Sequence, residues 1–219
     1  MYEAAEASST NLNTLIVSND VGTPDLGDRF KLAHTLAVAL WSLHSLDWLH
    51  KSLCSSNILF FPSTFVASAT RSSAVAEGIP AISSPFLLGL GASRPDQMGE
   101  MSVASTDPAA SDLHRHPDSL KGMSRKTYGK SFVIYSLGLV LLEIGLWKVL
   151  QTYHKPHYSA ERFRDKVVIQ NLVPNLSSKT GRLYREVVER CISAQENLTG
   201  EEAGKLMEYV VGSLESLRV

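Results

Sequence analysis

The chain has 219 residues, of which 44% are hydrophobic and 20% are charged, and this composition is typical of one globular domain with a sizeable core. Its formal net charge of -1, with no run of basic residues, argues against nucleic acid as a partner. Cys54 and Cys191 show no pairing pattern, which argues against a disulfide framework. Because Glu3 and Glu6 stand where a secretory signal would be positive, we expect an intracellular, cytoplasmic protein.

The first part of the chain is expected to contribute little to the core. Residues 1–28 are polar and show no sustained periodicity, which predicts a flexible lead-in. From Asp28 onward, apolar residues recur at helical spacing and predict a helix over 29–47, with Asp28 able to cap its start. The folded domain is therefore expected to span residues 29–216.

Two short apolar runs follow this helix. Residues 58–61 end at Pro62 and residues 86–88 end at Gly89, and both have the length and punctuation of strands. Residues 63–84 between them are rich in Ser and Ala and are expected to form a surface insertion.

The most apolar stretch of the chain predicts a central helix over 132–150. It is too short for a membrane span and has Glu143 inside it, so we expect no membrane segment. Residues 95–127 before it are polar and predict a long loop. Later helices are predicted over 159–169, 181–193 and 199–216. The predicted fold class is mainly α with a small β element.

The sequence from His50 to Phe60, HKSLCSSNILF, has the spacing of the kinase catalytic loop, H-R-D-L-x-x-x-N, followed by an apolar strand. His50 and Asn57 match that pattern, whereas Ser52 stands where a kinase has its catalytic Asp. The chain thus resembles the C-terminal lobe of a protein kinase, a helical domain. In kinases, this Asp positions the substrate hydroxyl and the Asn holds magnesium.

Three further motifs follow in kinase-like order. Gly89-Leu90-Gly91 stands at the position of Asp-Phe-Gly, so the metal-binding carboxylate is missing. His116-Pro117-Asp118 resembles Ala-Pro-Glu, and the sequence VIYSLG, residues 133–138, resembles the Asp-Val-Trp-Ser-Leu-Gly that opens the central helix. Residues 95–127 then correspond to an activation segment. Over about residues 28–215, the pattern is similar to the degenerate kinase-like domains of filamentous fungi found behind prion-inhibition (HeLo-type) domains, which implies self-recognition or cell-death signalling.

The resemblance also implies that one part of a kinase is missing. Only 27 residues precede the matched region, and no G-x-G-x-x-G motif occurs in the chain. Without the N-terminal lobe, apolar surface of the C-terminal lobe is expected to be exposed. We therefore expect a protein partner or a companion domain to cover that face.

The retained motif positions, His50, Ser52, Asn57 and Gly89, are vestigial catalytic-loop and metal or nucleotide positions. No catalytic residue is intact, and we expect no metal site and no cofactor, because phosphoryl transfer needs carboxylates that hold magnesium. Asn57 has two interpretations, a hydrogen bond to the loop backbone or residual metal binding. His50 is expected to pack within the core, as its kinase counterpart does.

Other candidate sites are weaker. The pairs His114 and His116, and His154 and His157, have the residue type of metal ligands but lack a nearby Cys or third His, so they are interpreted as loop histidines. Arg115 with His116 could read a phosphorylated activation segment, with acceptors at Ser102, Ser105 and Thr106, although a solvated polar loop is the simpler interpretation. Asp118 is expected to lack the Arg partner of the kinase Glu, since residues 192–202 contain no Arg.

Three interpretations of function stay open. The first is a catalytically inactive, pseudokinase-like interaction or regulatory module. The second is a fragment of a divergent, ATP-dependent protein kinase that obtains its N-lobe from a longer chain or a partner, with weak ATP and magnesium binding. The third is a gene product with misplaced boundaries.

Overall fold

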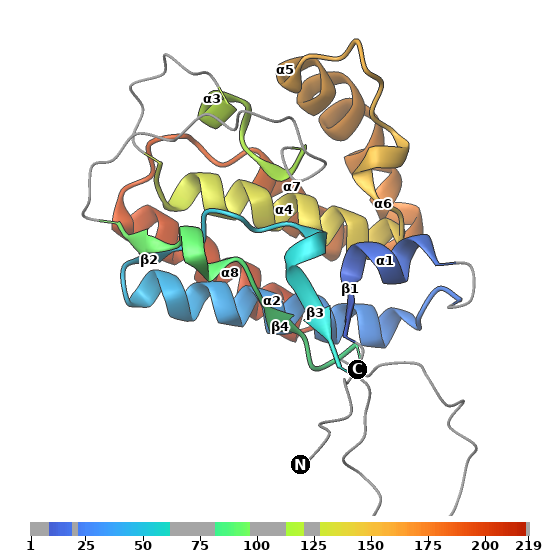
Figure 1. The fold of residues 1–219 in the computed structure, drawn as a ribbon, viewed down its shortest axis with the longest axis horizontal. Coiled ribbons are helices and arrows are strands. Elements are labelled where there is room, and N and C mark those ends of the chain that lie inside the picture. The colour runs from blue at the N-terminus through green and yellow to red at the C-terminus, as the bar shows by residue number, and fades with distance from the viewer. Residues whose placement is uncertain (1–8, 19–21, 62–81, 97–112, 121–127, 218–219) are drawn as a thin grey trace, which may run out of the picture.

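A buried helix, α4, runs through the middle of the molecule, with the other elements packed around it (Figure 1). The computed structural model describes residues 9–18, 22–61, 82–96, 113–120 and 128–217. These residues form a mainly helical domain with a small three-stranded antiparallel sheet. The helices are α1 (Leu12–Val17), α2 (Leu26–Ser45), α3 (Pro117–Leu120), α4 (Lys130–Leu146), α5 (Ala160–Arg162), the π-helix η5 (Phe163–Leu172), α6 (Val173–Thr180), α7 (Arg182–Ile192) and α8 (Gly200–Glu215). Single 3₁₀ turns occur at η1 (Ser55–Asn57), η2 (Leu90–Ala92) and η4 (Leu150–Thr152).

The small sheet has the order β1-β3-β4 and is antiparallel throughout. β3 (Ile58–Phe60) lies in the centre, with β1 (Thr10–Asn11) and β4 (Phe86–Leu87) on its two sides. A second pair is formed by β2 (Trp48–Leu49) and β5 (Arg94–Pro95). The strands expected over 58–61 and 86–88 are therefore present, and they pair with each other.

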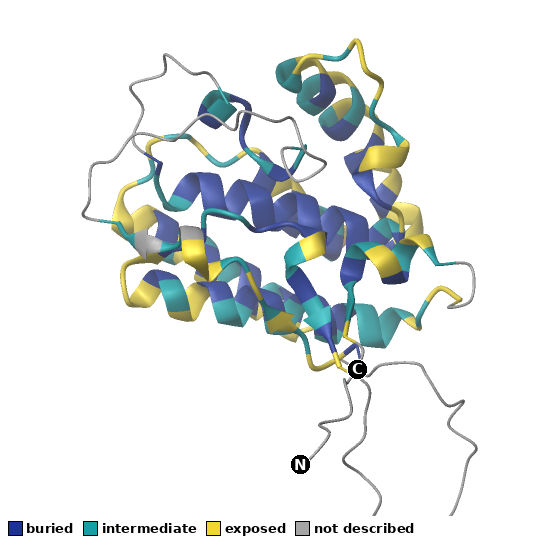
Figure 2. Cartoon of the chain, viewed as in Figure 1, coloured by how far each residue is buried: buried dark blue, intermediate teal, exposed yellow. Residues whose placement is uncertain are grey.

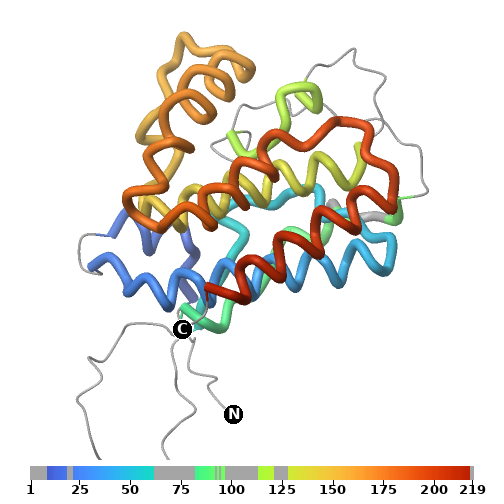
Figure 3. Tube along the Cα trace, turned by 180° about the vertical axis from the view of Figure 1, so that it is seen from behind, coloured from blue at the N-terminus to red at the C-terminus, as the bar shows by residue number. Residues whose placement is uncertain are grey.

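α4 is buried along almost its whole length, which Figure 2 shows as a continuous dark-blue helix. α7 packs closely on it because Gly138 has no side chain: a Cβ there would lie 2.7 Å from Cβ of Cys191. From behind, α8 runs alongside α2 (Figure 3), and these two helices contact each other along their lengths. The predicted helix over 132–150 is thus the core helix, although it ends at Leu146, where Trp147 takes a φ of 50°.

The expected lead-in over residues 1–28 is wrong for its second part. Asn11 accepts a hydrogen bond from the Thr14 backbone N–H at 2.8 Å and caps α1, and Leu12 and Leu15 are buried. β1 pairs with β3, which lies far along the chain. A helix of two turns is too short to show periodicity, and this strand depends on a non-local partner. Residues 1–8 lie outside the described part.

The helices predicted over 29–47, 181–193 and 199–216 correspond to α2, α7 and α8. The helix predicted over 159–169 continues through η5 and α6 to Thr180. Pro174 does not end it, because this residue lies at the start of α6, where its missing N–H is tolerated. Most of the expected 63–84 insertion and of the 95–127 loop lies outside the described residues. The described part of that loop contains α3, a short helix that was not predicted.

Candidate functional site

His50 joins the two loops that carry the kinase-like motifs. Its side chain is fully buried, and its Nε2–H donates to the Leu88 carbonyl oxygen at 2.8 Å. Burial lowers the pKa of His50, an effect that the bond to Leu88 opposes. The residue is therefore a neutral part of the core, and it holds the 86–90 segment against the loop at 50–57.

Ser52, Asn57 and Gly89 come together, although Gly89 lies far from the other two in sequence. Asn57 Nδ2 donates to the Ser52 carbonyl oxygen at 2.7 Å. Gly89 has a φ of +86°, and a Cβ placed on it would lie 2.8 Å from Asn57 Nδ2 and 3.4 Å from Ser52 Cβ. The backbone of Gly89 thus lies directly against the side chains of Ser52 and Asn57.

This cluster does not fit a magnesium-bound nucleotide. The Asn57 amide group is held by the loop backbone, which is the first of the two interpretations given above. A carboxylate at residue 89 would need the space that Asn57 occupies. Ser52 offers a neutral hydroxyl, and Mg²⁺ in proteins relies on one or two carboxylates. We derive no phosphotransfer step through these residues.

A buried hydrogen-bonded pair, Glu143 and His114, lies near the C-terminal end of α4. Glu143 Oε2 lies 2.8 Å from His114 Nε2, and Glu143 Oε1 accepts from the Leu150 backbone N–H at 2.7 Å. Both side chains are almost fully buried. Glu143 therefore ties the segment before α3 and the turn η4 to the core helix, and His114 is a core residue instead of a loop histidine.

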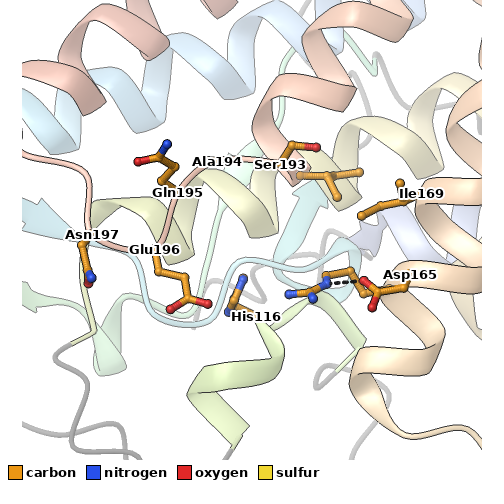
Figure 4. A pocket seen from close by; sticks show the side chains of 10 residues that line it. His116, Asp165, Ile169, Ser193, Ala194, Gln195, Glu196 and Asn197 are labelled. Carbon is orange, nitrogen blue, oxygen red and sulfur yellow. Dashed lines mark hydrogen bonds and ion pairs between the residues drawn. The ribbon is translucent and has the colours of Figure 1, made fainter.

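A second cluster lies beside a pocket of about 500 Å³ between α3, η5 and the loop that follows α7. His116 and Glu196 line this pocket, and in Figure 4 their side chains point toward each other. One potential ligand atom of His116, one of Asp118 and one of Glu196 all lie within 4.8 Å of one another. Among the described residues, no Cys or further His belongs to this cluster, as expected from the sequence, and the two groups near His116 are the carboxylates of Asp118, close in sequence, and of Glu196, from the loop after α7.

The histidine ring of this cluster is held firmly. It stacks on Phe132 with the ring centroids 4.8 Å apart and meets the Tyr135 ring edge to face at 4.8 Å. The Asp118 backbone N–H donates to His116 Nδ1 at 3.2 Å. His116 is buried by these contacts, unlike a residue of a solvated loop.

Comparison with protein families gives one result. A family model described as a domain of unknown function (DUF7580) matches residues 3–209. The chain belongs to this family. A search of curated proteins finds no match for it.

The DUF7580 match includes both clusters and the N-terminal elements β1 and α1. It begins upstream of residue 28, where the kinase-like pattern was expected to start. The family therefore treats the segment 10–17 as part of the domain, in agreement with its buried leucines. Among the described residues of this DUF7580 domain, no helix is long and apolar enough to cross a membrane.

Sequence reasoning about this DUF7580 domain missed Glu196 and Arg164. The expectation that Asp118 lacks an Arg considered only residues 192–202, but Arg164 on η5 interacts electrostatically with Asp118. Burial lowers the pKa of Arg164, but the bond to Asp165 and the charge of Asp165, with smaller effects of Tyr135 and Asp118, outweigh it and raise the pKa. The candidate phosphate acceptors Ser102, Ser105 and Thr106 lie outside the described residues.

Proposed function

We propose that this chain is a catalytically inactive, pseudokinase-like module that binds a protein partner. The observation that carries the proposal is the cluster of Ser52, Asn57 and Gly89. The motif spacing assigns these residues to the positions at which a kinase holds its catalytic and metal-binding groups, and here the amide of Asn57 fills the space that a carboxylate at residue 89 would need. The chain therefore keeps the positions of the kinase motifs but lacks the carboxylates that a kinase has at two of them.

The order of the described elements supports the kinase-like interpretation. α2 leads into the loop at His50, β3 and β4 follow as an antiparallel pair, and α4 forms a buried central helix. His50 and Asn57 each make a hydrogen bond to the loop backbone. These bonds hold the loops in place, as expected of a domain that keeps its fold in order to bind a partner. Fold alone does not define function, so the proposal depends on the site.

The partner surface is proposed on the side of the small sheet. Phe61, Phe86, Leu88 and Leu90 are exposed there, and the rings of Phe61 and Phe86 meet edge to face with centroids 5.0 Å apart. Exposed large apolar side chains that lie on neighbouring segments mark interaction sites. This is the face that the kinase resemblance assigns to an N-lobe, and a partner protein or companion domain would cover it.

A charge-introducing variant tests this surface. Leu88 and Leu90 are 47% and 52% exposed, so Leu88→Asp combined with Leu90→Asp should leave the fold intact. We expect the wild-type chain to bind an environment-sensitive apolar dye and the double variant to lose most of that fluorescence. Val17→Asp is the matched control, since Val17 is 58% exposed on α1, outside the proposed surface. Equal dye binding by the wild type and the double variant, with unchanged circular dichroism, would contradict the proposal.

The biological setting of the proposal is intracellular self-recognition or cell-death signalling of the fungal type, and it rests on the resemblance alone. The kinase-fragment alternative gains no support from the cluster, because a supplied N-lobe would not create carboxylates at Ser52 and Gly89.

A further inference from the structure

Charge is divided unevenly along the C-terminal part of the chain. Residues 148–185 contain eight Lys or Arg residues and two acidic residues, whereas residues 186–217 contain two Lys or Arg residues and seven acidic residues. Part of this charge is neutralised within α7, where two Arg side chains pair with Glu side chains one turn later. The charges that remain form two separate surfaces, one positive and one negative.

The positive surface, which we call the basic surface, consists of Lys148, Lys155 and Arg162. Lys148 Nζ lies 5.5 Å from the centroid of the Tyr153 ring. Lys155 Nζ and Arg162 Cζ lie 5.9 and 5.0 Å from the centroid of the Tyr158 ring. All three cations are exposed, and none of them pairs with a carboxylate among the described residues. Because the tyrosine rings restrict these long side chains, an incoming carboxylate meets cations that are already partly ordered.

The negative surface is one side of α8, which we call the acidic stripe. Its exposed members Glu201, Glu208 and Glu215 are seven residues apart, so they follow one side of the helix over roughly 21 Å. Glu201 pairs with Lys205 at 2.6 Å, whereas Glu208 and Glu215 have no cationic partner within the described part of the chain. These two carboxylates are available to cations from outside.

One chain cannot join its own two surfaces. α5 and η5 extend from one side of the molecule, and α8 lies at the opposite side, against α2 (Figure 1, Figure 3). A second copy can present its α8 to the basic surface of the first. The formal net charge of -1 gives little long-range repulsion between copies, so the local charge pattern decides how they approach. Several charge pairs in a complementary pattern set the orientation of such a contact, although each exposed pair contributes little alone.

We propose that the chain associates head to tail with a second copy of itself, with the basic surface of one copy on the acidic stripe of the next. The two surfaces differ, so the contact is heterologous, and every dimer keeps one basic surface and one acidic stripe for further copies. Neither the exposed apolar side chains of the proposed partner surface nor the Ser52 cluster takes part in this contact. Each proposal can therefore fail without the other.

Sedimentation velocity of the full chain at several concentrations tests this proposal. We expect the weight-average sedimentation coefficient to rise with concentration in about 20 mM NaCl and to keep the monomer value in about 1 M NaCl, where the Debye length is about 3 Å. Lys155→Glu combined with Arg162→Glu should be monomeric at both salt concentrations, and so should Glu208→Lys combined with Glu215→Lys. A mixture of these two variants should associate at low salt, because each supplies the charge that the other has lost.

Lys179→Glu combined with Arg182→Glu is the matched control. It changes the net charge as much as Lys155→Glu combined with Arg162→Glu does, but at exposed positions outside the basic surface, so it should associate like the wild type. All the substituted side chains are exposed, and the fold should persist, which circular dichroism checks.

Four results would overturn the proposal. They are a wild-type chain that stays monomeric at low salt, an association that persists at high salt, a mixture of the two charge variants that stays monomeric, and loss of association in the control. A monomeric wild type that instead binds polyglutamate or phosphatidylserine vesicles would also contradict it, because an acidic protein or a membrane would then occupy the basic surface.

Discussion

Gly89 adopts a φ of +86° directly against the side chain of Asn57. Gly89→Asp should lower the free energy of unfolding by about 1–2 kcal/mol from the backbone conformation alone, and the contact with Asn57 Nδ2 adds to this. The carboxylate should not create magnesium-dependent ATP binding, because its Cβ position is crowded by that amide. Urea unfolding measures the first effect, and calorimetric titration with ATP and Mg²⁺ measures the second.

Gly91→Ala is the matched control for this variant. Gly91 lies two residues further on, and a Cβ placed on it would meet no other atom within 4 Å, so this substitution should change the stability little. Restored magnesium-dependent ATP binding in Gly89→Asp would contradict the interpretation of the cluster.

His44 makes the stability of the chain sensitive to acid. It is buried on α2, and neither ring nitrogen has a hydrogen-bond partner among the described residues. Burial, with a smaller effect of the Lys130 charge, lowers the pKa of His44 from 6.5 to about 4. The unfolded chain therefore takes up a proton near pH 6.5 and the folded chain only near pH 4, so stability present above pH 6.5 is lost as the pH falls.

His44→Leu should remove this loss. Between pH 7 and pH 5 the free energy of unfolding of the wild type should fall by about 2 kcal/mol relative to the variant. Urea unfolding at several pH values measures the difference, and His157→Leu, at an exposed position, should follow the wild-type curve. Parallel curves for the wild type and His44→Leu would show that His44 is not responsible.

At the level of single residues, the sequence predicted the positions of a motif but not the contacts around them. His50, Ser52 and Asn57 are close in sequence, and the motif spacing already placed Gly89 with them. Glu196 had no such signal, because it reaches His116 only through the packing of the loop after α7 on α3. Polar residues brought together by tertiary structure leave no local pattern in one sequence.

Close packing of α4 on α7 depends on Gly138. A Cβ at this position would lie 2.7 Å from Cys191 Cβ and 2.9 Å from Ile192 Cγ1. Gly138→Ala should therefore destabilise the chain by about 1–3 kcal/mol, as overpacked cores do. In contrast, Gly204→Ala on α8 meets no atom within 4 Å and should stabilise the chain by up to about 1 kcal/mol.

Urea unfolding of the two alanine variants and the wild type measures both effects. The change in the free energy of unfolding should have opposite signs in Gly138→Ala and Gly204→Ala. Both variants replace a helix glycine by alanine, and they differ mainly in the space that the new Cβ finds. A Gly138→Ala variant with a higher free energy of unfolding than the wild type would show that α4 and α7 do not pack as closely at this position as the structure has them.

At the level of elements, the long periodic helices were predictable and the short elements were not. α2, α7 and α8 carry an apolar period over three turns or more, and this pattern predicts them. β1, β2, β5 and α1 each span six residues or fewer, too few to show an apolar period. The three strands pair with partners distant in sequence, and the Asn11 cap is a local signal for α1 alone. The helix predicted to end at residue 169 continues to Thr180, and Pro174 lies at the start of α6, where its missing N–H is tolerated.

For the whole molecule, the fold class was predictable because one strongly apolar helix requires other helices around it. α4 is buried over residues 131–145, and α2, α6, α7 and α8 pack against it. The pocket beside His116 was not predictable, because it forms only where segments from three parts of the chain meet. The proposed partner surface follows from the kinase resemblance, which assigns this face to an N-lobe, and from the exposed apolar side chains that lie on it.

Thermal unfolding of the purified chain with and without millimolar ATP and Mg²⁺ tests the central claim most directly. A nucleotide present at about 100 times its dissociation constant adds roughly 2.7 kcal/mol, which for a chain of this size raises Tm by roughly 5–10 °C. We predict a cooperative transition with the same Tm in both samples, because Ser52, Asn57 and Gly89 offer no carboxylate for the metal. A magnesium-dependent rise in Tm would contradict the account and would show that other groups replace the missing carboxylates.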